Sequence, residues 1–484
     1  MSQESIASTN QLEELILKVG SDAVVTNPAT IDNYRWDRAN DPEAGIPVAV
    51  VRARSVEDIQ ATVRFAATHR IPVVARGAGS GLSGGSSAVE GCIILSLEAM
   101  RAMTIDPVTR TAVVQPGALN AEVKAAAAEH GLWYPPDPSS FEFCSIGGNI
   151  ATNAGGLCCV KYGVTADYVL GMKVVLADGR LVQLGGPRLK DVAGLNLTQL
   201  FVGSEGTLGI ITEVTLRLVP AQRPPTTLVA TFATLDDATN AVLAVTSSLR
   251  PSMLEFMDQY TINAVEDVTG MGLERDAAAM LIFQSDEPAE LAAQEIETIE
   301  TLCLDHQASD VFATSDAEEA EAIIAARRMA IPAVERKGSI LLEDVGVPLP
   351  RLGDLVRGID QIASERQVPI AVIAHAGDGN THPLLVFDPQ DTEQRHRAQL
   401  AYGDVMDLAV DLGGTITGEH GVGRLKQPWL VDSIGQDALE LNHRIKYALD
   451  PHNIFNPGAI YASDEMVSTA SSGLNQDIGA FRTP

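Results

Sequence analysis

Three glycine-dense segments in the first half of the chain constrain its fold more than any other feature. They lie at Arg76–Gly81 (RGAGSG), Ser145–Gly156 (SIGGNIATNAGG) and Gly203–Ile211 (GSEGTLGII). Ordering a glycine costs more conformational entropy than ordering any other residue, so three such segments are poorly explained as exposed turns. Glycine backbones also let N–H groups approach phosphate oxygens closely. We therefore expect one long ligand to lie between the three segments.

A Rossmann nucleotide site is an alternative for the first segment, because Glu98 follows it about twenty residues later. Rossmann glycines, however, open directly into a helix. Here Ser80–Ser87 contains three further glycines and leads to a predicted strand at Cys92–Leu97. The sequence therefore argues against a Rossmann fold.

The pattern of apolar residues predicts an α+β chain with two main domains. Residues 1–41 carry a short N-terminal helix, 42–221 are rich in predicted strands, and a proline-rich break at Pro220–Pro225 precedes 222–460. In this last part, the order strand, helix, strand, strand, helix, strand resembles split βαβ units. It predicts an antiparallel sheet with helices on one face.

Composition limits the classes of function. The formal net charge of −29 repels phosphates, so no nucleic-acid partner is expected. The five cysteines show no CxxC spacing, and Cys158 and Cys159 are interpreted as small buried residues rather than a redox pair. The sequence shows no signal peptide and no apolar run long enough for a membrane span, so a cytoplasmic location is expected. Residues 461–484 are polar and are expected to form a mobile tail.

The last third contains a second group of chemically informative residues, in HAGDGNTH (His375–His382) and TGEHGVG (Thr417–Gly423). A strand ending at His375, a tight turn and a strand beginning near His382 can bring two imidazoles to one side of a hairpin. Glu419 adds an oxygen ligand, which gives a two-histidine, one-carboxylate site suited to zinc, manganese or iron. The alternative is that these are polar turn residues with satisfied hydrogen bonds.

With these motifs, the chain resembles the vanillyl-alcohol oxidase, or PCMH-type FAD, superfamily from about Tyr34 to Pro457. It is most similar to the branch with the glycolate oxidase FAD subunit, D-lactate dehydrogenase and D-2-hydroxyglutarate dehydrogenase. The resemblance implies a PCMH-type FAD-binding domain followed by an α+β substrate (cap) domain. It also implies noncovalent FAD, because members with covalent flavin carry a histidine where this chain has Ser80. The implied FAD contacts are Arg76, Gly77, Ala78, Gly79, Ser80, Gly81, Pro136, Asp137, Ser139, Ser140, Gly147, Gly148, Asn149, Ala151, Thr152, Glu205, Gly206, Gly209, Ile211 and Asn456.

The same resemblance implies roles for the second group of residues. His375, His382 and Glu419 would hold one divalent metal, zinc being expected first, and His420 would act as the base. A metal on a substrate hydroxyl lowers its pKa, an imidazole accepts the proton, and flavin N5 accepts the hydride. Arg327 aligns with a family arginine for the substrate carboxylate. Arg424 and Lys426 are weaker candidates for the same role, because a short basic loop usually lies on a solvated face.

The expected reaction is oxidation of a small 2-hydroxy monocarboxylate, glycolate or D-lactate. The hydroxyglutarate enzymes have a lysine where this chain has Leu342 and an asparagine where it has Leu384, and apolar residues there would leave a second carboxylate unpaired. The alternatives are D-2-hydroxyglutarate oxidation, a metal-dependent hydrolase, and a non-catalytic FAD subunit. The resemblance implies a second FAD subunit and an iron–sulfur subunit as partners, through which the chain could lie at a membrane surface. It leaves the electron acceptor open.

Overall fold

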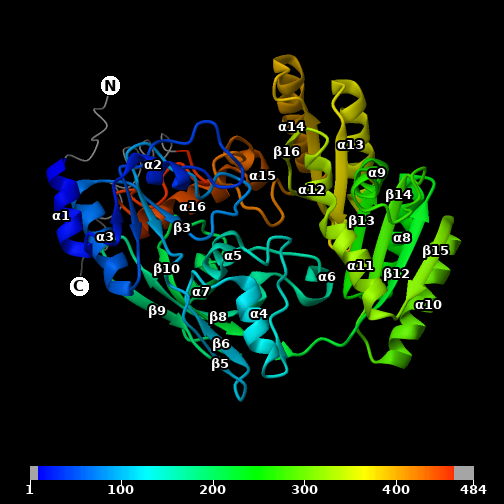
Figure 1. The fold of residues 1–484 in the computed structure, drawn as a ribbon, viewed down its shortest axis with the longest axis horizontal. Helices are drawn as coiled ribbons and strands as arrows, with labels where there is room; N and C mark the ends of the chain where they lie inside the picture. The colour runs from blue at the N-terminus through cyan, green and yellow to red at the C-terminus, as the bar shows by residue number, and fades with distance from the viewer. Residues whose placement is uncertain (1–8, 463–484) are drawn as a thin grey trace, which may run out of the picture.

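The described part of the chain, residues 9–462 of the computed structural model, forms two lobes (Figure 1). Residues 1–8 lie outside this description, and so does the expected tail 461–484 apart from Tyr461 and Ala462. Helices and sheets occur in both lobes, which confirms the α+β class. Within residues 9–462, no helix combines the length and the apolar character needed to cross a bilayer.

A parallel β–α–β unit forms one half of the first lobe. Its elements are β2 (Ala49–Arg52), α3 (Val56–His69), β3 (Val73–Arg76) and β4 (Ile93–Ser96), and α1 (Thr9–Val19) and the antiparallel strand β1 (Val24–Val25) lie beside it. Strand β4 lies between β2 and β3 and runs parallel to both. Ser55 Oγ caps α3 by accepting a hydrogen bond from the Asp58 backbone N–H. The three strands are mostly apolar and buried, as parallel strands usually are.

An antiparallel sheet in the order β5, β6, β10, β8, β9 forms the other half of this lobe. Its strands are β5 (Met103–Asp106), β6 (Thr111–Val114), β8 (Val169–Val175), β9 (Leu181–Gly185) and β10 (Ile210–Arg217), beside α4 (Asn120–Ala128), α7 (Leu197–Phe201) and the pair β7 (Leu132–Trp133) and β11 (Val219–Pro220). The second glycine segment forms a short helix, α5 (Ile146–Thr152), which was not predicted. The first glycine segment leads to β4 without a helix, in agreement with the argument against a Rossmann fold.

One antiparallel sheet organises the second lobe, in the order β15, β12, β14, β13, β18, β19, β16, with β17 beside β19. Its strands are β12 (Thr226–Phe232), β13 (Met253–Asp258), β14 (Ala279–Ser285), β15 (Ala308–Thr314), β16 (Ser339–Leu342), β17 (Val345–Gly346), β18 (Ile370–His375) and β19 (Asn380–Phe387). The predicted antiparallel sheet is therefore present. Strands β18 and β19 pair as a hairpin within it, which carries both predicted histidines.

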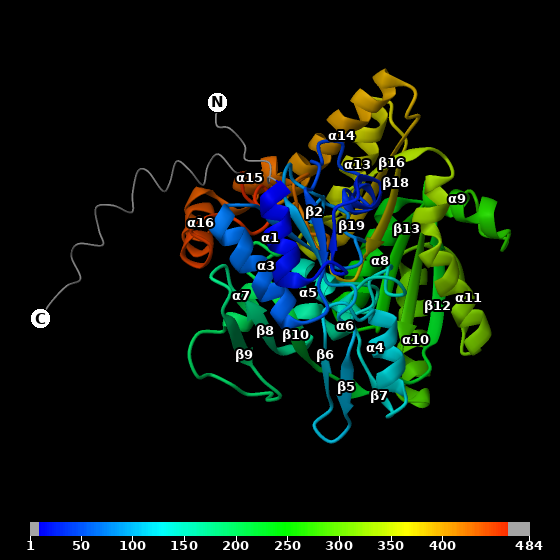
Figure 2. The same cartoon turned by 60° about the vertical axis from the view of Figure 1, so that its left-hand side comes forward.

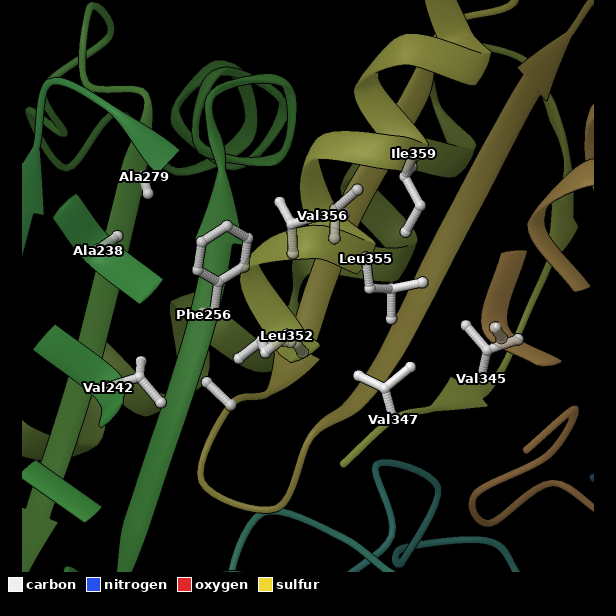
Figure 3. Close-up of a cluster of buried hydrophobic side chains, with 14 of the residues drawn as sticks. Ala238, Val242, Phe256, Ala279, Val345, Val347, Leu352, Leu355, Val356 and Ile359 are labelled. Atoms are coloured by element: carbon white, nitrogen blue, oxygen red, sulfur yellow. The ribbon is translucent and has the colours of Figure 1, made fainter. Parts of the chain in front are cut away.

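Helices cover both faces of this sheet, so the prediction of helices on one face is wrong. The helices are α8 (Leu235–Thr246), α9 (Gln259–Thr269), α10 (Ala289–Asp305), α11 (Ala317–Arg328), α12 (Ala330–Glu335), α13 (Leu352–Arg366) and α14 (Thr392–Asp411). Leu254 and Phe256 of β13 pack with α8, α10, α13 and α14, whereas Met253 and Met257 pack with α9, α11 and α12. Figure 3 shows part of the first cluster, with Phe256 among side chains of α8 and α13. Apolar side chains on both sides of a strand require both faces to be covered.

The C-terminal segment leaves the second lobe and returns to the first. Helix α16 (Gln436–Leu449) lies in the lobe of α1 and α3 (Figure 2), and the remaining short helices are α2 (Pro28–Ile31), α6 (Cys159–Tyr162) and α15 (Leu430–Ile434). Phe455 pairs with Val73 of β3, and its side chain is fully buried in the core of the first lobe. Lys446 of α16 anchors this return: its buried Nζ lies 2.6 Å from Asp450 Oδ2 and donates to two backbone carbonyls.

Replacing Lys446 by methionine should destabilise the protein strongly. The substitution leaves Asp450 as a buried carboxylate without its cation, a change that costs about 3–5 kcal/mol. The exposed pair of Lys18 with Glu14 is a matched control, because such i,i+4 pairs contribute only about 0.3–0.5 kcal/mol. We expect Lys446→Met to lower the thermal unfolding midpoint clearly and Lys18→Met to leave it unchanged. Equal midpoints for the two variants would contradict the anchoring role.

Candidate active site

The three glycine segments meet at one cavity of about 1370 Å³, counted out to its open mouth. A ligand bound in it would contact all three segments at once. The predicted cofactor residues that line it are Gly77, Ala78, Gly79, Ser80, Gly81, Ser139, Ser140, Gly147, Gly148, Asn149, Ala151, Thr152, Glu205, Gly206, Gly209 and Ile211. Asp37 and Arg38 also line it and were not predicted.

Hydrogen bonds tie the three segments to one another. Ser145 Oγ accepts from the backbone N–H groups of Ala78 and Gly148, at 3.3 Å each, and so joins the first segment to the second. The Glu205 N–H donates to Ala151 O at 2.9 Å, which joins the second to the third. A Cβ on Gly77 would lie 2.2 Å from Ser145 Oγ, so only glycine permits this approach. The cavity wall is therefore a single cross-linked unit.

Four predicted cofactor residues lie behind the cavity wall rather than in it. The Asn456 side chain donates to Gly85 O at 2.7 Å and to Glu205 O at 2.8 Å, which braces the loop after the first glycine segment and the third segment from behind. Arg76 lies under Gly79, with its guanidinium 5.9 Å from the Tyr34 ring. Pro136 O accepts from Asn120, and the Asp137 carboxylate accepts from the Cys158 N–H. These residues shape the wall from outside.

The β18–β19 hairpin places two imidazoles side by side, as the motif spacing predicted. His375 ends β18, the turn follows, and His382 pairs across the hairpin with Ile373. Their ring centroids are 5.1 Å apart. His420 comes from the loop Thr417–Gly423 and stacks on His382 with centroids 4.9 Å apart. Three imidazoles from two distant segments therefore form one cluster.

All three imidazoles direct Nε2 towards the same carboxylate oxygen. Glu419 Oε1 lies 3.3 Å from His375 Nε2, 3.2 Å from His382 Nε2 and 3.9 Å from His420 Nε2. One ligand atom each from His375, His382 and Glu419 lie within 4.8 Å of one another, a spacing that one ion could bridge. Two imidazoles and a carboxylate are also the donor types that zinc and non-haem metals bind. The donor set therefore fits a divalent metal.

Glu255, which was not predicted, holds His375 from the far side. Its Oε1 lies 2.8 Å from His375 Nδ1, and its Oε2 lies 2.6 Å from Arg327 Nη2. The predicted substrate arginine is therefore buried, paired with Glu255 and outside the wall of the glycine cavity. The sequence did contain a signal for Glu255, which is the single acidic residue inside the apolar strand Leu254–Met257. A carboxylate buried in such a strand requires a charged or hydrogen-bonding partner.

A second buried carboxylate, Asp344, holds the loop Thr417–Gly423. Its Oδ2 accepts from Thr417 Oγ1 at 2.7 Å and from the backbone N–H groups of Gly418, Glu419 and His420 at 2.9, 3.0 and 2.8 Å. Asp344 directly follows Glu343 at the end of a predicted strand. The sequence gives no direct indication that it reaches a loop more than seventy residues away.

The first lobe holds the same loop from its other end. The carboxylate of Glu205 accepts from the N–H groups of Val422 at 2.8 Å and Gly423 at 2.9 Å. Ser83 Oγ donates to His420 O at 2.7 Å. A Cβ on Gly423 would lie 1.9 Å from Ser83 O, and its φ of +54° also favours glycine. The loop thus connects the glycine cavity to the imidazole cluster.

Burial and neighbouring charges shift the pKa values of the cluster. Burial alone would lower the pKa of His375, but Glu255 and Glu419 outweigh it and raise that pKa well above its usual value. Burial would raise the pKa of Glu419, yet His375 and His382 hold it well below its usual value. Burial lowers the pKa of His420 to about 4 against the opposing charge of Asp344. At neutral pH, His420 is an uncharged imidazole able to accept a proton.

Of the two cations beyond His420, Lys426 is buried and Arg424 is half-buried, so the expected solvated face is wrong for Lys426. Lys426 is fully buried and donates to the carbonyls of Asp344 and Ile416, with Glu343 Oε2 3.3 Å away. The Arg424 guanidinium donates to Gly84 O and to Asn456 Oδ1 at 2.6 and 2.7 Å. A short basic loop is buried here because its charges meet carbonyls and carboxylates that are themselves buried.

Apolar residues close the glycine cavity near the imidazoles. Leu342 and Ile331 line it together with Glu419 and His420. Leu384 is fully buried in the core beside α9, α11 and α12 and does not reach the lining.

Cys158 and Cys159 are free thiols, as expected. A second cavity is lined by His375, Asp378 and Glu419. The side chains of His375 and Glu419 are therefore accessible from outside the glycine cavity.

Comparisons with known proteins agree with this geometry. Residues 47–185 match the family described as "FAD binding domain", and residues 221–460 match "FAD linked oxidases, C-terminal domain". The glycolate oxidase subunit GlcD of Bacillus subtilis is 41% identical over 89% of this chain and 92% of its own length. The D-lactate dehydrogenase of Archaeoglobus fulgidus is 36% identical over 89% and 95%.

Solved structures show the same fold at low identity. A 4-ethylphenol oxidase from Gulosibacter chungangensis superposes with a TM-score of 0.78 at 19% identity, over 95% of this chain and 98% of its own. The identity of 41% to a full-length relative, and the match to both domains, assign the family. The chain is an FAD-linked oxidoreductase and belongs to the family of FAD-linked oxidases.

Proposed function

We propose that this chain oxidises a short 2-hydroxy monocarboxylate, glycolate or D-lactate, to the 2-oxo acid. The observation that carries this proposal is the meeting of three imidazole Nε2 atoms at Glu419 Oε1, on the wall of the glycine cavity. The names of the relatives, a glycolate oxidase subunit and a D-lactate dehydrogenase, support the same substrate class. FAD bound noncovalently in the cavity would accept the hydride from the substrate Cα at N5.

The residues of the cluster would bind the metal, accept the hydroxyl proton and bind the substrate carboxylate. His375, His382 and Glu419 would hold a divalent metal, which would lower the pKa of a substrate hydroxyl. His420 Nε2, 3.9 Å from Glu419 Oε1, would accept the hydroxyl proton. Arg327 keeps Nη2 on Glu255, while its buried Nε has no hydrogen-bond partner within residues 9–462. That free donor supports a role for Arg327 towards the substrate carboxylate.

Two further features support the finer points. Ser80 lines the cavity in the segment where covalent flavoproteins of the family have histidine, which supports noncovalent FAD. Leu342 and Ile331 present apolar surface beside His420, where a second substrate carboxylate would lose its hydration unpaired. The Bacillus relative is named as a subunit, which supports transfer of electrons to partner subunits in a complex.

Anaerobic mixing with a panel of 2-hydroxy acids tests the proposal directly. Glycolate or D-lactate should bleach the flavin absorbance, and D-2-hydroxyglutarate should do so far more slowly, because Leu342 offers its second carboxylate no partner. Specificity constants for each acid give the comparison. Preference for D-2-hydroxyglutarate would overturn the monocarboxylate assignment, and a colourless protein with hydrolase activity would overturn the flavin reaction itself.

Replacing His420 by glutamine should slow substrate-driven flavin reduction by about 10²–10⁴-fold, the usual contribution of a general base. The glutamine keeps a polar side chain of similar reach, so FAD should stay bound. His130, which is exposed, provides the matched control as His130→Gln. The measurement is stopped-flow absorbance under saturating substrate. An unchanged rate constant in His420→Gln would remove the base role.

Removing the metal should stop the reaction without releasing the flavin. In His382→Ala one of three ligands is lost, so metal affinity should fall by more than the roughly 10–100-fold seen when outer partners of a ligand are removed. Elemental analysis of the wild type should give one metal per chain, and the variant should give none after dialysis. The visible flavin spectrum is the control for an intact cavity. A wild type that is fully active after complete chelation would contradict the metal assignment.

A further inference from the structure

Asp344 faces the imidazole cluster with an oxygen that the loop does not use. While Oδ2 accepts the hydrogen bonds from the loop Thr417–Gly423, Oδ1 lies 3.7 Å from His382 Nδ1. One ligand atom each from Asp344, His382 and His420 lie within 4.8 Å of one another. Asp344 Oδ1, His382 Nδ1 and His420 Nδ1 are buried and have no hydrogen-bond partner within the described part of the chain. All three atoms are therefore available for an interaction within the cluster.

The position of the hydrogen on His382 depends on what its Nε2 binds. A carboxylate only accepts, and a neutral imidazole has one N–H and one lone pair. His382 has a carboxylate near each nitrogen, Asp344 at Nδ1 and Glu419 at Nε2, so the hydrogen lies on Nδ1 where Nε2 binds a metal. His375 also lies between two carboxylates, because its Nδ1 is 2.8 Å from Glu255 and its Nε2 is 3.3 Å from Glu419.

The charge on Asp344 is maintained inside the protein. Asp344 and Glu343 are both fully buried, and Lys426 Nζ lies 3.3 Å from Glu343 and 4.0 Å from Asp344. Three backbone N–H groups and one hydroxyl also point at Oδ2. A carboxylate with this many donors stays ionised and stays in place.

We propose that Asp344 is the positioning residue of this site, holding the loop with Oδ2 and the Nδ1–H forms of His382 and His420 with Oδ1. The Nε2 lone pair of His382 is then available to a metal, and that of His420 to a substrate proton. This inference rests on the proposed function for the roles of the two imidazoles. The attachment of the loop to Asp344 stands whatever the substrate is.

The competing interpretation is a second cation site formed by Asp344, His382 and His420. In that case Nδ1 of each imidazole would be a ligand and would carry no hydrogen. His382 would then bridge two cations. Metal analysis separates the two interpretations, since our proposal requires one metal per chain.

The experiment compares the full-length holoprotein with Asp344→Asn and Glu343→Gln. Glu343→Gln is the matched control, because Glu343 is the adjacent buried carboxylate, pairs with Lys426 and forms no hydrogen bond with the imidazoles within residues 9–462. Histidine labelled with ¹⁵N distinguishes Nδ1–H from Nε2–H rings. Metal affinity, FAD affinity and the rate constant of flavin reduction are measured on the same samples.

In the wild type we expect Nδ1–H forms for His375, His382 and His420. In Asp344→Asn the signals of His382 and His420 should change while His375 keeps its form through Glu255. Metal affinity should fall by about 10–100-fold, the usual effect of losing an outer partner of a ligand. FAD affinity should not change, and Glu343→Gln should leave the His382 and His420 signals as they are in the wild type.

Three results would overturn the proposal: unchanged His382 and His420 signals in Asp344→Asn, equal changes in all three histidines, or two metals per chain. If Asp344→Asn does not fold, Thr417→Val removes one of the four donors, and the wild-type spectrum alone decides the tautomers. Failure of every 2-hydroxy acid to reduce the wild-type flavin would instead sink the proposed function, and the histidine signals would be unaffected by that outcome.

Discussion

The loop Thr417–Gly423 is held between two buried carboxylates that belong to different lobes, and the rest of the site depends on this double attachment. Asp344 binds its first half and Glu205 its second. Glu419 and His420 are among the residues whose backbone N–H groups Asp344 binds. Each carboxylate would be costly to bury alone, but each is offset by backbone N–H groups that would otherwise lack partners. The position of His420 is therefore a property of the interface between lobes.

Buried charge recurs wherever distant segments must be aligned. Glu255 links Arg327 of α11 to His375 of β18, Lys426 links the loop to Glu343, and Lys446 links α16 to Asp450 and to the third glycine segment. Apolar packing tolerates small shifts, whereas a charged hydrogen bond has a defined length and direction. The glycine cavity is aligned in the same way, by Ser145 and Asn456.

The parts that could be predicted from sequence are those encoded locally. The glycine segments, the β18–β19 hairpin and the antiparallel sheet follow from spacing and apolar pattern over a few residues. Asp344 and Glu255 escaped prediction because their partners lie 76 and 120 residues away in the chain. The same reason explains two wrong predictions, the solvated position of Lys426 and the single helical layer on the sheet of the second lobe. In both cases, burial is decided by segments that come together only in the folded chain.

The return of the C-terminal segment has a consequence for the order of folding during synthesis. Ile454 and Phe455 complete the core of the first lobe, and Asn456 braces the loop after its first glycine segment and its third segment. The ribosome therefore releases almost the whole polypeptide before that lobe can close, although N-terminal domains usually fold first. Until then its apolar strands remain partly uncovered. The wall of the glycine cavity is therefore braced only once Asn456 has been synthesised.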